Sequence, residues 1–321
     1  MTRLLGVLLM VLILYALLMG FFEKARSLDN HQVLARRLGF YGVLTLGVGV
    51  LIVTGGIDLS IGSLVGLSAV AFGYLMNERR WPPLPAAALV IAASVAIGLF
   101  HGLLVTGLRL QPFLVTLCGL FMYRGLARKL SSTTVVLPFE SVQPQAERLR
   151  SLLVSDTTLG LPHVLLLLGL LAAVLAVVLH GSVYGRYWYA IGYNEQAARY
   201  AGIATQRYKI AAYIISSTCA GLGGVLFLLE YRSATPSDAG SLLELYAITG
   251  AVLGGCNLRG GEGSVLGMIL GAAVLPLLAQ ICTTSRYIGS ELEYTVIGGA
   301  LLLATIANEL VTRLSKSRAR A

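Results

Sequence analysis

The chain has 321 residues, of which 56% are hydrophobic and 12% are charged, and its mean hydropathy is +0.80. Soluble domains carry about 25% charged residues, so the composition excludes a soluble globular protein and predicts one membrane domain over residues 1–321. The net charge of +9 lies mainly in short segments between apolar runs and in the tail 313–321. This placement favours anionic membrane lipid over nucleic acid as the partner.

Apolar segments recur along the chain at about the 20-residue length that a helix needs to cross a bilayer. They lie near residues 4–22, 38–54, 59–76, 85–107, 110–127, 162–180, 209–230, 243–256, 264–282 and 292–309. We therefore predict an all-α polytopic membrane protein with about ten transmembrane helices. The first segment is long for a signal peptide and lacks a small-x-small cleavage site, so we expect it to remain as a span.

Two polar stretches separate the apolar segments. Residues 128–161 form the longest loop, and residues 181–209 contain a predicted short helix at about 194–203. Asn194 suits the N-cap of that helix, Glu195 suits its positive start, and Gly202 suits its C-terminal stop. The basic tail and this second stretch favour a cytoplasmic location for both termini, although lysine and arginine show no inside excess over the other loops.

The segment 55–63 reads Gly-Gly-Ile-Asp-Leu-Ser-Ile-Gly-Ser and lies between two apolar runs. A carboxylate at membrane depth is costly and indicates a functional site, and non-helical backbone there must be buried in protein or line a wet cavity. Asp58 either contacts a polar solute or caps the next helix by accepting hydrogen bonds from the amides of Ser60 or Ile61. Capping alone accounts for the pattern. Ser60, Asn257 and Glu244 are the other polar residues that we expect along a solute pathway.

Glycines break the chain at two places and then recur at four-residue spacing. We expect broken or re-entrant helices around Gly55 and Gly254, and close helix packing at the spaced glycines, because small residues let helices approach in lipid. The second segment either repeats the first or uses glycine independently. The predicted structural glycines are Gly55, Gly56, Gly62, Gly66, Gly254, Gly255, Gly263, Gly267 and Gly271.

Other polar residues in the apolar segments give weaker signals. Arg124 either extends to the lipid headgroups or forms an intramembrane ion pair with Glu230, Glu244 or Glu293. His101 and the four cysteines show no metal-ligand spacing, so we predict no metal site. The sequence has no phosphate-binding Gly-x-x-x-x-Gly-Lys motif, and we expect no cofactor and no ATP site in this chain.

Four motifs, in order, resemble the inner-membrane permease subunit of carbohydrate-uptake ABC transporters of the ribose, xylose and galactose type. The first is the segment 55–63. The second comprises Pro-Phe-Leu-Val-Thr-Leu at 112–117 with Arg-Gly-Leu-Ala at 124–127, and the third is Ala-Ile-Gly-x-Asn at 190–194 followed by Gly202 and Ile203. The fourth is the glycine-rich stretch 254–267. The resemblance covers about residues 38–308, and the branched-chain amino-acid permeases share parts of it.

This resemblance implies an ABC importer permease fold without enzymatic activity of its own. ATP and Mg²⁺ would be bound by a separate cytoplasmic ATPase, an extracytoplasmic sugar-binding protein would deliver the solute, and a second permease copy would complete a homodimer or heterodimer. The helix at 194–203 would dock into the ATPase as a coupling helix, through Asn194, Glu195, Ala197, Ala198, Gly202 and Ile203. The expected solute is ribose or a similar pentose or hexose, and the expected location is the bacterial inner membrane.

Two alternatives remain, namely transport of another small polar solute such as a branched-chain amino acid, and ion-coupled secondary transport through Asp58 or Glu244. The chain also departs from the family pattern, because Tyr246 stands where many relatives have an aspartate. This change removes one carboxylate from the expected pathway.

Overall fold

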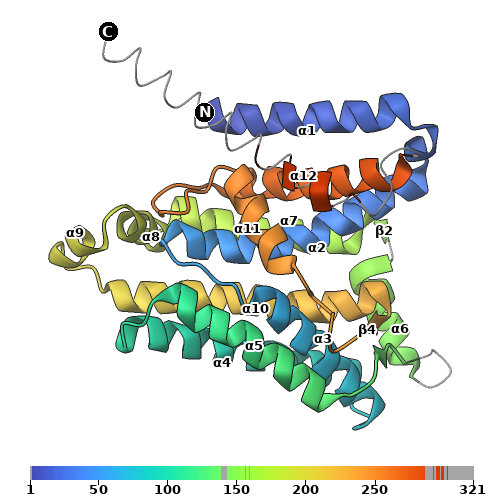
Figure 1. Ribbon diagram of the computed structural model, residues 1–321, viewed down its shortest axis with the longest axis horizontal. Helices are drawn as coiled ribbons and strands as arrows, with labels where there is room; N and C mark the ends of the chain where they lie inside the picture. The colour runs from blue at the N-terminus through green and yellow to red at the C-terminus, as the bar shows by residue number, and fades with distance from the viewer. Residues whose placement is uncertain are drawn as a thin grey trace.

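The computed structural model describes residues 2–138, 143–155, 157–158 and 160–285, with positions 292, 294–296, 298, 299 and 302. This part of the chain is almost entirely helical, as predicted (Figure 1). The helices are α1 (Thr2–Phe21), α2 (Leu28–Val53), α3 (Ile61–Asn77), α4 (Pro83–Gly107), α5 (Pro112–Leu130), α6 (Pro144–Arg150), α7 (His163–Ala176), α8 (Val183–Tyr193), α9 (Glu195–Tyr200), α10 (Thr205–Tyr231), α11 (Leu243–Leu253) and α12 (Val265–Thr284).

Short irregular elements connect these helices. One 3-10 turn, η1 (Glu23–Arg26), follows α1, and two π-helical turns, η2 (Ser151–Ser155) and η3 (Val177–Gly181), flank α7. Two small antiparallel ribbons pair β1 (Val135–Val136) with β4 (Ser233–Ala234), and β2 (Thr157–Thr158) with β3 (Leu161–Pro162). The ribbon of β1 and β4 joins the loop after α5 to the end of α10.

Six helices in the described part are long and apolar enough to span a membrane, namely α1, α2, α4, α7 with η3, α10 and α12. The predicted segments around α3, α5 and α11 are also helical, but α3 and α11 are shorter and α5 carries three cations near its end. The predicted segment 292–309 falls mostly outside the described residues. The fold class is confirmed as an all-α polytopic membrane protein.

The break predicted after the second apolar segment is present. α2 ends at Val53, the chain continues without regular structure through Ser60, and α3 then begins inside the molecule (Figure 1). The left-handed backbone of Gly55, with φ of +80°, supports this stop. α11 has 11 residues, which corresponds to roughly 16 Å and is well short of a bilayer core of about 30 Å. α11 is therefore too short to cross a bilayer core by itself, whereas α3, with 17 residues, lies at the lower limit for a span.

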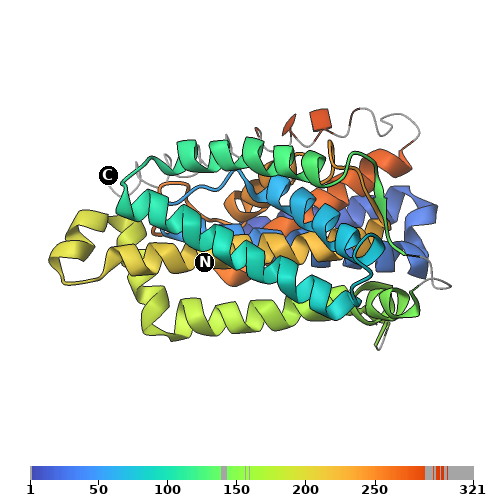
Figure 2. The same cartoon turned by 90° about the horizontal axis from the view of Figure 1, so that it is seen from below.

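The core of the bundle is formed by α2 and α10. The apolar window of α2 is 78% buried and that of α10 is 72% buried, whereas α1 is 11% buried and lies on the periphery (Figures 1 and 2). Glycines on α4 make the approach to α10 possible. A Cβ atom on Gly98 would come within 2.7 Å of the α10 backbone at Ile214, and one on Gly102 within 2.8 Å of Ile210. Small residues thus determine the helix contacts that hydropathy does not specify.

Several connections gather at one end of the bundle. α9 protrudes there, and the connection between α4 and α5, the end of α8, the loop 254–263 and the start of α1 lie at the same end (Figure 1). We refer to this region as the α9 end. α3 runs from the break after α2 to the opposite end of the bundle, where Asn77 Nδ2 donates a hydrogen bond to the Val136 carbonyl (Figure 1).

Candidate functional site

Asp58 lies in the irregular segment before α3 and is fully buried. Its Oδ1 atom accepts hydrogen bonds from the Ser60 amide at 2.9 Å and from Ser60 Oγ at 2.6 Å, and its Oδ2 atom accepts one from Ser216 Oγ at 3.3 Å. The predicted bond from the Ser60 amide is therefore present. The bond from Ser216, on α10, was not predicted, and it fastens the start of α3 to the core of the bundle.

A cluster of buried polar side chains surrounds Asp58. Tyr123 Oη on α5 is hydrogen-bonded to His101 Nε2 on α4 at 2.7 Å, and the ring of Tyr213 on α10 meets the His101 ring edge-on at 6.4 Å between centroids. Each of these three side chains is at most 5% exposed. His101 Nδ1 and Tyr213 Oη have no hydrogen-bond partner within the described residues. The sequence identified His101 only as a structural residue, because its partners lie on other helices.

Glu244 lies in the first turn of α11 and is 9% exposed. Its Oε2 atom is buried and has no hydrogen-bond partner in the described part of the chain. This carboxylate packs against Gly62 on α3, where an added Cβ would overlap Glu244 Oε2 and the carbonyl oxygen of Gly240. One turn later, a Cβ on Gly66 would overlap the carbonyl oxygen of Ala239. The segment 239–244, which leads into α11, therefore packs directly against the two glycines of α3.

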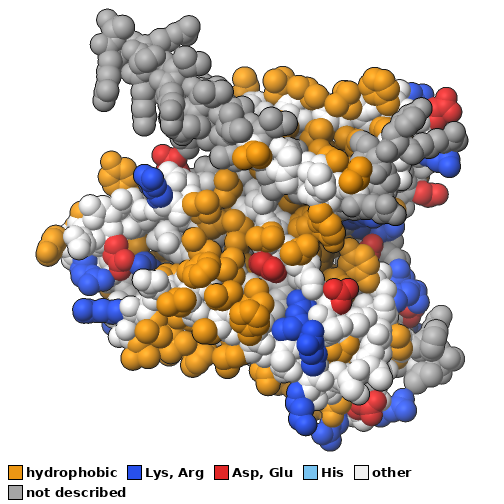
Figure 3. Space-filling view, in the orientation of Figure 1, with side chains coloured by type: hydrophobic (Ala, Val, Ile, Leu, Met, Phe, Trp, Pro, Cys, Tyr) orange, Lys and Arg blue, Asp and Glu red, His pale blue; other side chains and the backbone are white. Residues whose placement is uncertain are grey.

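Arg124 also belongs to this contact. Its Nη1 atom donates to the carbonyl oxygen of Ala239 at 2.5 Å. The ion pair suggested by the sequence is absent among the described residues, because Glu230 instead pairs with Arg36 at 3.4 Å and Glu244 lies outside ion-pair distance of Arg124. Glu293, the third predicted partner, lies outside the described residues. Figure 3 shows a few acidic and basic side chains within an otherwise hydrophobic face over α3, α5 and α11.

The late glycine-rich segment forms the loop between α11 and α12. Asn257 Oδ1 accepts from the Arg259 amide at 3.0 Å, so the expected pathway residue stabilises its own loop. Gly254 meets Gly267, and Gly271 meets Gly250, without room for a Cβ on either side, so α12 packs closely on α11. Gly263 was predicted to pack on the same helix as Gly267 and Gly271. This prediction is wrong, because α12 begins two residues after Gly263 and Ser264 is its N-cap.

The two glycine-rich segments meet in space at the α9 end. The Gly261 amide donates to the Val53 carbonyl at 2.9 Å, and a Cβ on Gly260 would lie 2.8 Å from the Gly55 amide nitrogen and 2.7 Å from Gly192 Cα. Gly56 packs beside these groups on Leu51, and Gly255 has a left-handed backbone with φ of +94°. We call this meeting of α2, α8 and the loop 254–263 the glycine junction. It places both irregular segments next to the residues that lead into α9.

The short helix predicted at 194–203 is present as α9. Asn194 Oδ1 accepts from the Ala197 amide at 3.0 Å, and Gly202, with φ of +82°, ends the helix. Ala198 was expected to face a partner, but it is only 6% exposed and packs within this chain. Ala197 is exposed, and so are two large apolar side chains that the sequence reasoning missed, Tyr193 and Tyr200, which are 87% and 90% exposed. The Ile203 amide donates to the Ala198 carbonyl and completes the turn after α9.

Ion pairs attach α9 to the start of α10. Glu195 Oε1 accepts from Arg199 at 3.0 Å, and Oε2 accepts from Lys209 at 2.5 Å. Partial burial raises the pKa of the Glu195 carboxyl, but the bonds and charges of Lys209 and Arg199 outweigh it, so the pKa lies below its ordinary value. The carboxylate therefore stays ionised at neutral pH.

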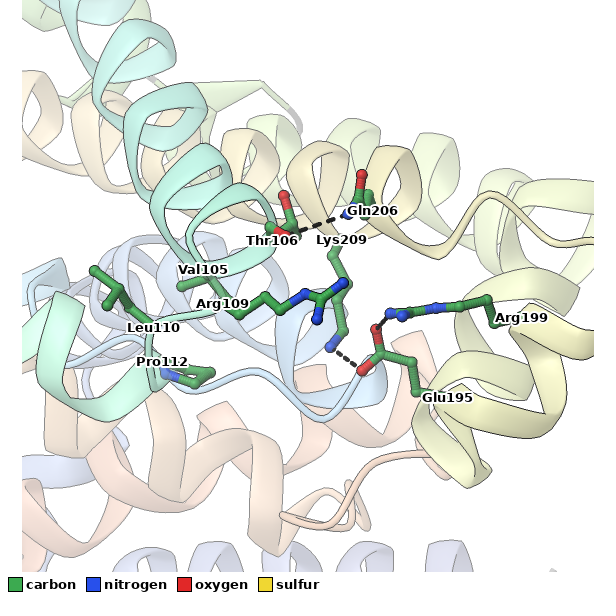
Figure 4. A pocket seen from close by; sticks show the side chains of 9 residues that line it. All are labelled: Val105, Thr106, Arg109, Leu110, Pro112, Glu195, Arg199, Gln206 and Lys209. Atoms are coloured by element: carbon green, nitrogen blue, oxygen red, sulfur yellow. Dashed lines mark hydrogen bonds and ion pairs between the residues drawn. The ribbon is translucent and has the colours of Figure 1, made fainter.

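These residues line a pocket of about 290 Å³ between α9, the start of α10 and the connection from α4 to α5 (Figure 4). The described residues contain no group of three or more His, Cys, Asp or Glu side chains that could hold a metal ion.

Comparison with known proteins assigns the family. The family described as branched-chain amino acid transport system, permease component, matches residues 32–305. The chain belongs to this permease family. The permease is 34% identical to the inner membrane ABC transporter permease protein YjfF of Escherichia coli K12, over 87% of this chain and 83% of that protein. No solved structure matches it.

Two further relatives are of the same type. The permease is 32% identical to the autoinducer 2 import system permease protein LsrD of Enterobacter sp. strain 638, over 85% of this chain and 83% of LsrD. It is 33% identical to the probable ABC transporter permease protein y4mJ of Sinorhizobium fredii, over 86% of this chain and 79% of that protein. The resemblance to an ABC permease is confirmed, and the permease is a multi-pass inner-membrane protein.

Proposed function

We propose that this permease is the membrane subunit of an ATP-driven importer for a small polar, sugar-like solute. Support for the solute class comes from LsrD, whose name describes import of autoinducer 2, and from the sequence resemblance to permeases of the ribose type. A pentose or hexose such as ribose is the solute that we expect. In this proposal, a separate cytoplasmic ATPase binds ATP and Mg²⁺, and an extracytoplasmic binding protein delivers the solute.

The observation that carries the proposal is the glycine junction. It joins the end of α2, the residues before α9 and the loop after α11 through contacts that leave no room for a Cβ. Backbone packed so closely moves as one unit, because close-packed elements change between discrete arrangements and do not deform continuously. A displacement of α9 by a partner therefore reaches the irregular segment before α3 and the end of α11.

The exposed surface of α9 fits the role of a coupling helix. Tyr193 ends α8 just before α9, Tyr200 is the last residue of α9, and most of the surface of both side chains is uncovered. Tyrosine is enriched at protein interfaces because it combines apolar area with a hydrogen-bonding group. We propose that these tyrosines and Ala197 contact the ATPase, while Asn194 and Gly202 fix the ends of the helix. Ala198 and Ile203 support α9 from within the chain. This arrangement assigns the α9 end to the cytoplasm.

The solute pathway is proposed along α3, α5 and α11. Glu244 lies there beside Gly62, and Arg124 lies beside Gly66. The face over these helices is largely hydrophobic (Figure 3). A second permease copy placed against this face would enclose the polar groups between two subunits. Asp58 and Ser60 hold the start of α3 in place, which makes them structural supports of the pathway in the state described.

The test is uptake by proteoliposomes that contain the permease with the ATPase and the binding protein that co-purify with it from its own organism. We expect a labelled pentose or hexose to accumulate across the membrane. Accumulation should require ATP on the side of the membrane that carries the ATPase, and it should not require an ion gradient. Uptake driven by a proton or sodium gradient without the ATPase would refute the proposal. A panel of ribose, other pentoses, hexoses and branched-chain amino acids identifies the solute class.

A branched-chain amino acid is the second candidate solute, because the description of the matched family names that transport system. Such a solute carries both an ammonium and a carboxylate group, for which Glu244 and Arg124 offer opposite charges. Competition between labelled ribose and unlabelled leucine in the same proteoliposomes decides between the two classes.

A further inference from the structure

The pocket between α9 and the connection from α4 to α5 is lined by an excess of positive charge. Arg109, Arg199 and Lys209 line it together with one carboxylate, Glu195, so the lining carries a net charge of +2. Figure 4 shows the three cationic side chains converging on the same hollow from three elements. Cations that face one another repel unless an anion lies between them. Glu195 compensates only one of the three.

Arg109 is the cation that nothing in the described chain neutralises. Glu195 gives one oxygen to Arg199 and the other to Lys209, whereas the Arg109 guanidinium has neither an ion pair nor a hydrogen bond among the described residues. Arg109 also has a left-handed backbone, with φ of +56°, which residues other than glycine rarely adopt. The Arg109 side chain is exposed, so its guanidinium is open to a ligand from solution, and strained backbone is concentrated at functional sites.

Helix ends add to this positive field. Pro112, in the first turn of α5, and Gln206, in the first turn of α10, both line the pocket. The N-terminus of a helix carries a partial positive charge that favours anions. The side-chain charges and the helix ends therefore act in the same direction.

We infer that this pocket binds a phosphate group. Arg109 offers a planar fork for two phosphate oxygens, and Lys209 and Arg199 add point charge from the opposite wall. The pocket lies at the end of α4, whose 25 residues correspond to roughly 37 Å and reach beyond a bilayer core of about 30 Å. The headgroup of an anionic phospholipid is available at that level, and a free phosphate ion is the other source of the same chemistry.

A bound phosphate would join the connection from α4 to α5 directly to α9. Arg109 would hold it from one side, and Arg199, on α9 itself, from the other. Anionic lipid would then restrain the helix that couples to the ATPase. This consequence rests on the proposed function, whereas the binding itself does not.

The test uses the full chain purified in detergent and titrated separately with short-chain phosphatidylglycerol, short-chain phosphatidylcholine and inorganic phosphate. Native mass spectrometry measures lipid binding, and ³¹P NMR line broadening measures phosphate binding. Arg109→Gln is the main variant, because Arg109 makes no hydrogen bond or ion pair with the described residues that the substitution would remove. Arg207→Gln is the matched control, since Arg207 is an exposed cation on α10 that does not line the pocket.

We expect phosphatidylglycerol to bind more tightly than phosphatidylcholine, with at least tenfold weaker binding in Arg109→Gln and normal binding in Arg207→Gln. Arg109→Lys should bind with intermediate affinity, because lysine keeps the charge but not the planar fork. Saturable binding of inorganic phosphate alone, with the same dependence on Arg109, supports the proposal and assigns a soluble source. The proposal is overturned if neither lipid nor inorganic phosphate binds, or if Arg109→Gln binds them as the wild type does. Loss of ATPase association in Arg109→Gln without any phosphate binding would instead identify a protein contact.

Discussion

Two substitutions of Asp58, to alanine and to asparagine, distinguish the contribution of its hydrogen bonds to stability from a requirement for its negative charge. The carboxylate is fully buried and accepts three hydrogen bonds, from the Ser60 amide, Ser60 Oγ and Ser216 Oγ. Asp58→Ala removes all of them and leaves the two hydroxyl groups without this acceptor. Asp58→Asn keeps an oxygen for Ser60 and presents its amide to Ser216, whose hydroxyl can also accept.

The magnitudes follow from these contacts. Asp58 closes the turn before α3, whose N-cap is Ser60, and loss of its bond from the Ser60 amide costs about 1 kcal/mol, as for a typical hydrogen bond. A buried hydroxyl left without its partner costs a further 1–3 kcal/mol, roughly. We expect Asp58→Ala to lower the free energy of unfolding by about 2–4 kcal/mol, and Asp58→Asn by about 1 kcal/mol, because only the charge assistance of the bonds is lost.

The matched control is Asp29→Ala, which changes an exposed aspartate in the first turn of α2. It should cost less than about 1 kcal/mol. Thermal unfolding in detergent and the folded fraction in the membrane measure stability, and proteoliposome uptake measures function. An Asp58→Ala variant as stable as Asp29→Ala would refute the structural role. A stable Asp58→Asn variant that folds but does not transport would show that the charge itself is required.

Three further predictions test the packing and the ion pairs. Gly66→Ala should destabilise the permease by about 1–3 kcal/mol because its Cβ overlaps a carbonyl group, whereas Gly125→Ala, on α5 with open space, should be neutral or stabilising in the same unfolding assay. Ala198→Trp should disrupt α9 in the isolated chain, because Ala198 is buried. Ala197→Trp, at an exposed position, should leave the fold intact and lower only the association with the ATPase, measured by pull-down. Equal folding of both variants would contradict the burial of Ala198. The lowered pKa of Glu195 means that its ion pairs stabilise α9 above the unfolded pKa, of about 4.3, and lose this effect as pH falls through the lower folded value. Hydrogen-exchange protection of α9, corrected for intrinsic rates, should be constant down to about pH 5 and fall only in strong acid, and Glu195→Gln should abolish that dependence.

The sequence by itself determined the features that depend on local chemistry. Hydropathy located the membrane segments, because each helix must satisfy its own backbone hydrogen bonds in lipid. Glycine and capping residues located the break after α2 and both ends of α9, where Asn194 and Gly202 act on neighbouring residues. The amide of Ser60 was a predicted partner of Asp58 for the same reason, since only two residues separate them.

The tertiary structure alone decided which distant residues meet. Ser216 reaches Asp58 from α10, and Ala198 turns inward on α9. Arg124 bonds to the carbonyl of Ala239, whereas the sequence left lipid headgroups and a carboxylate as alternatives. These contacts depend on which face each helix presents to its neighbours. In lipid, the close fit of small residues and the hydrogen bonds between polar groups determine which helix faces pack together. Hydropathy does not report either of these. The glycine junction is the clearest case, because two similar glycine segments, separated by about 200 residues, meet at the base of α9 only after the bundle has packed.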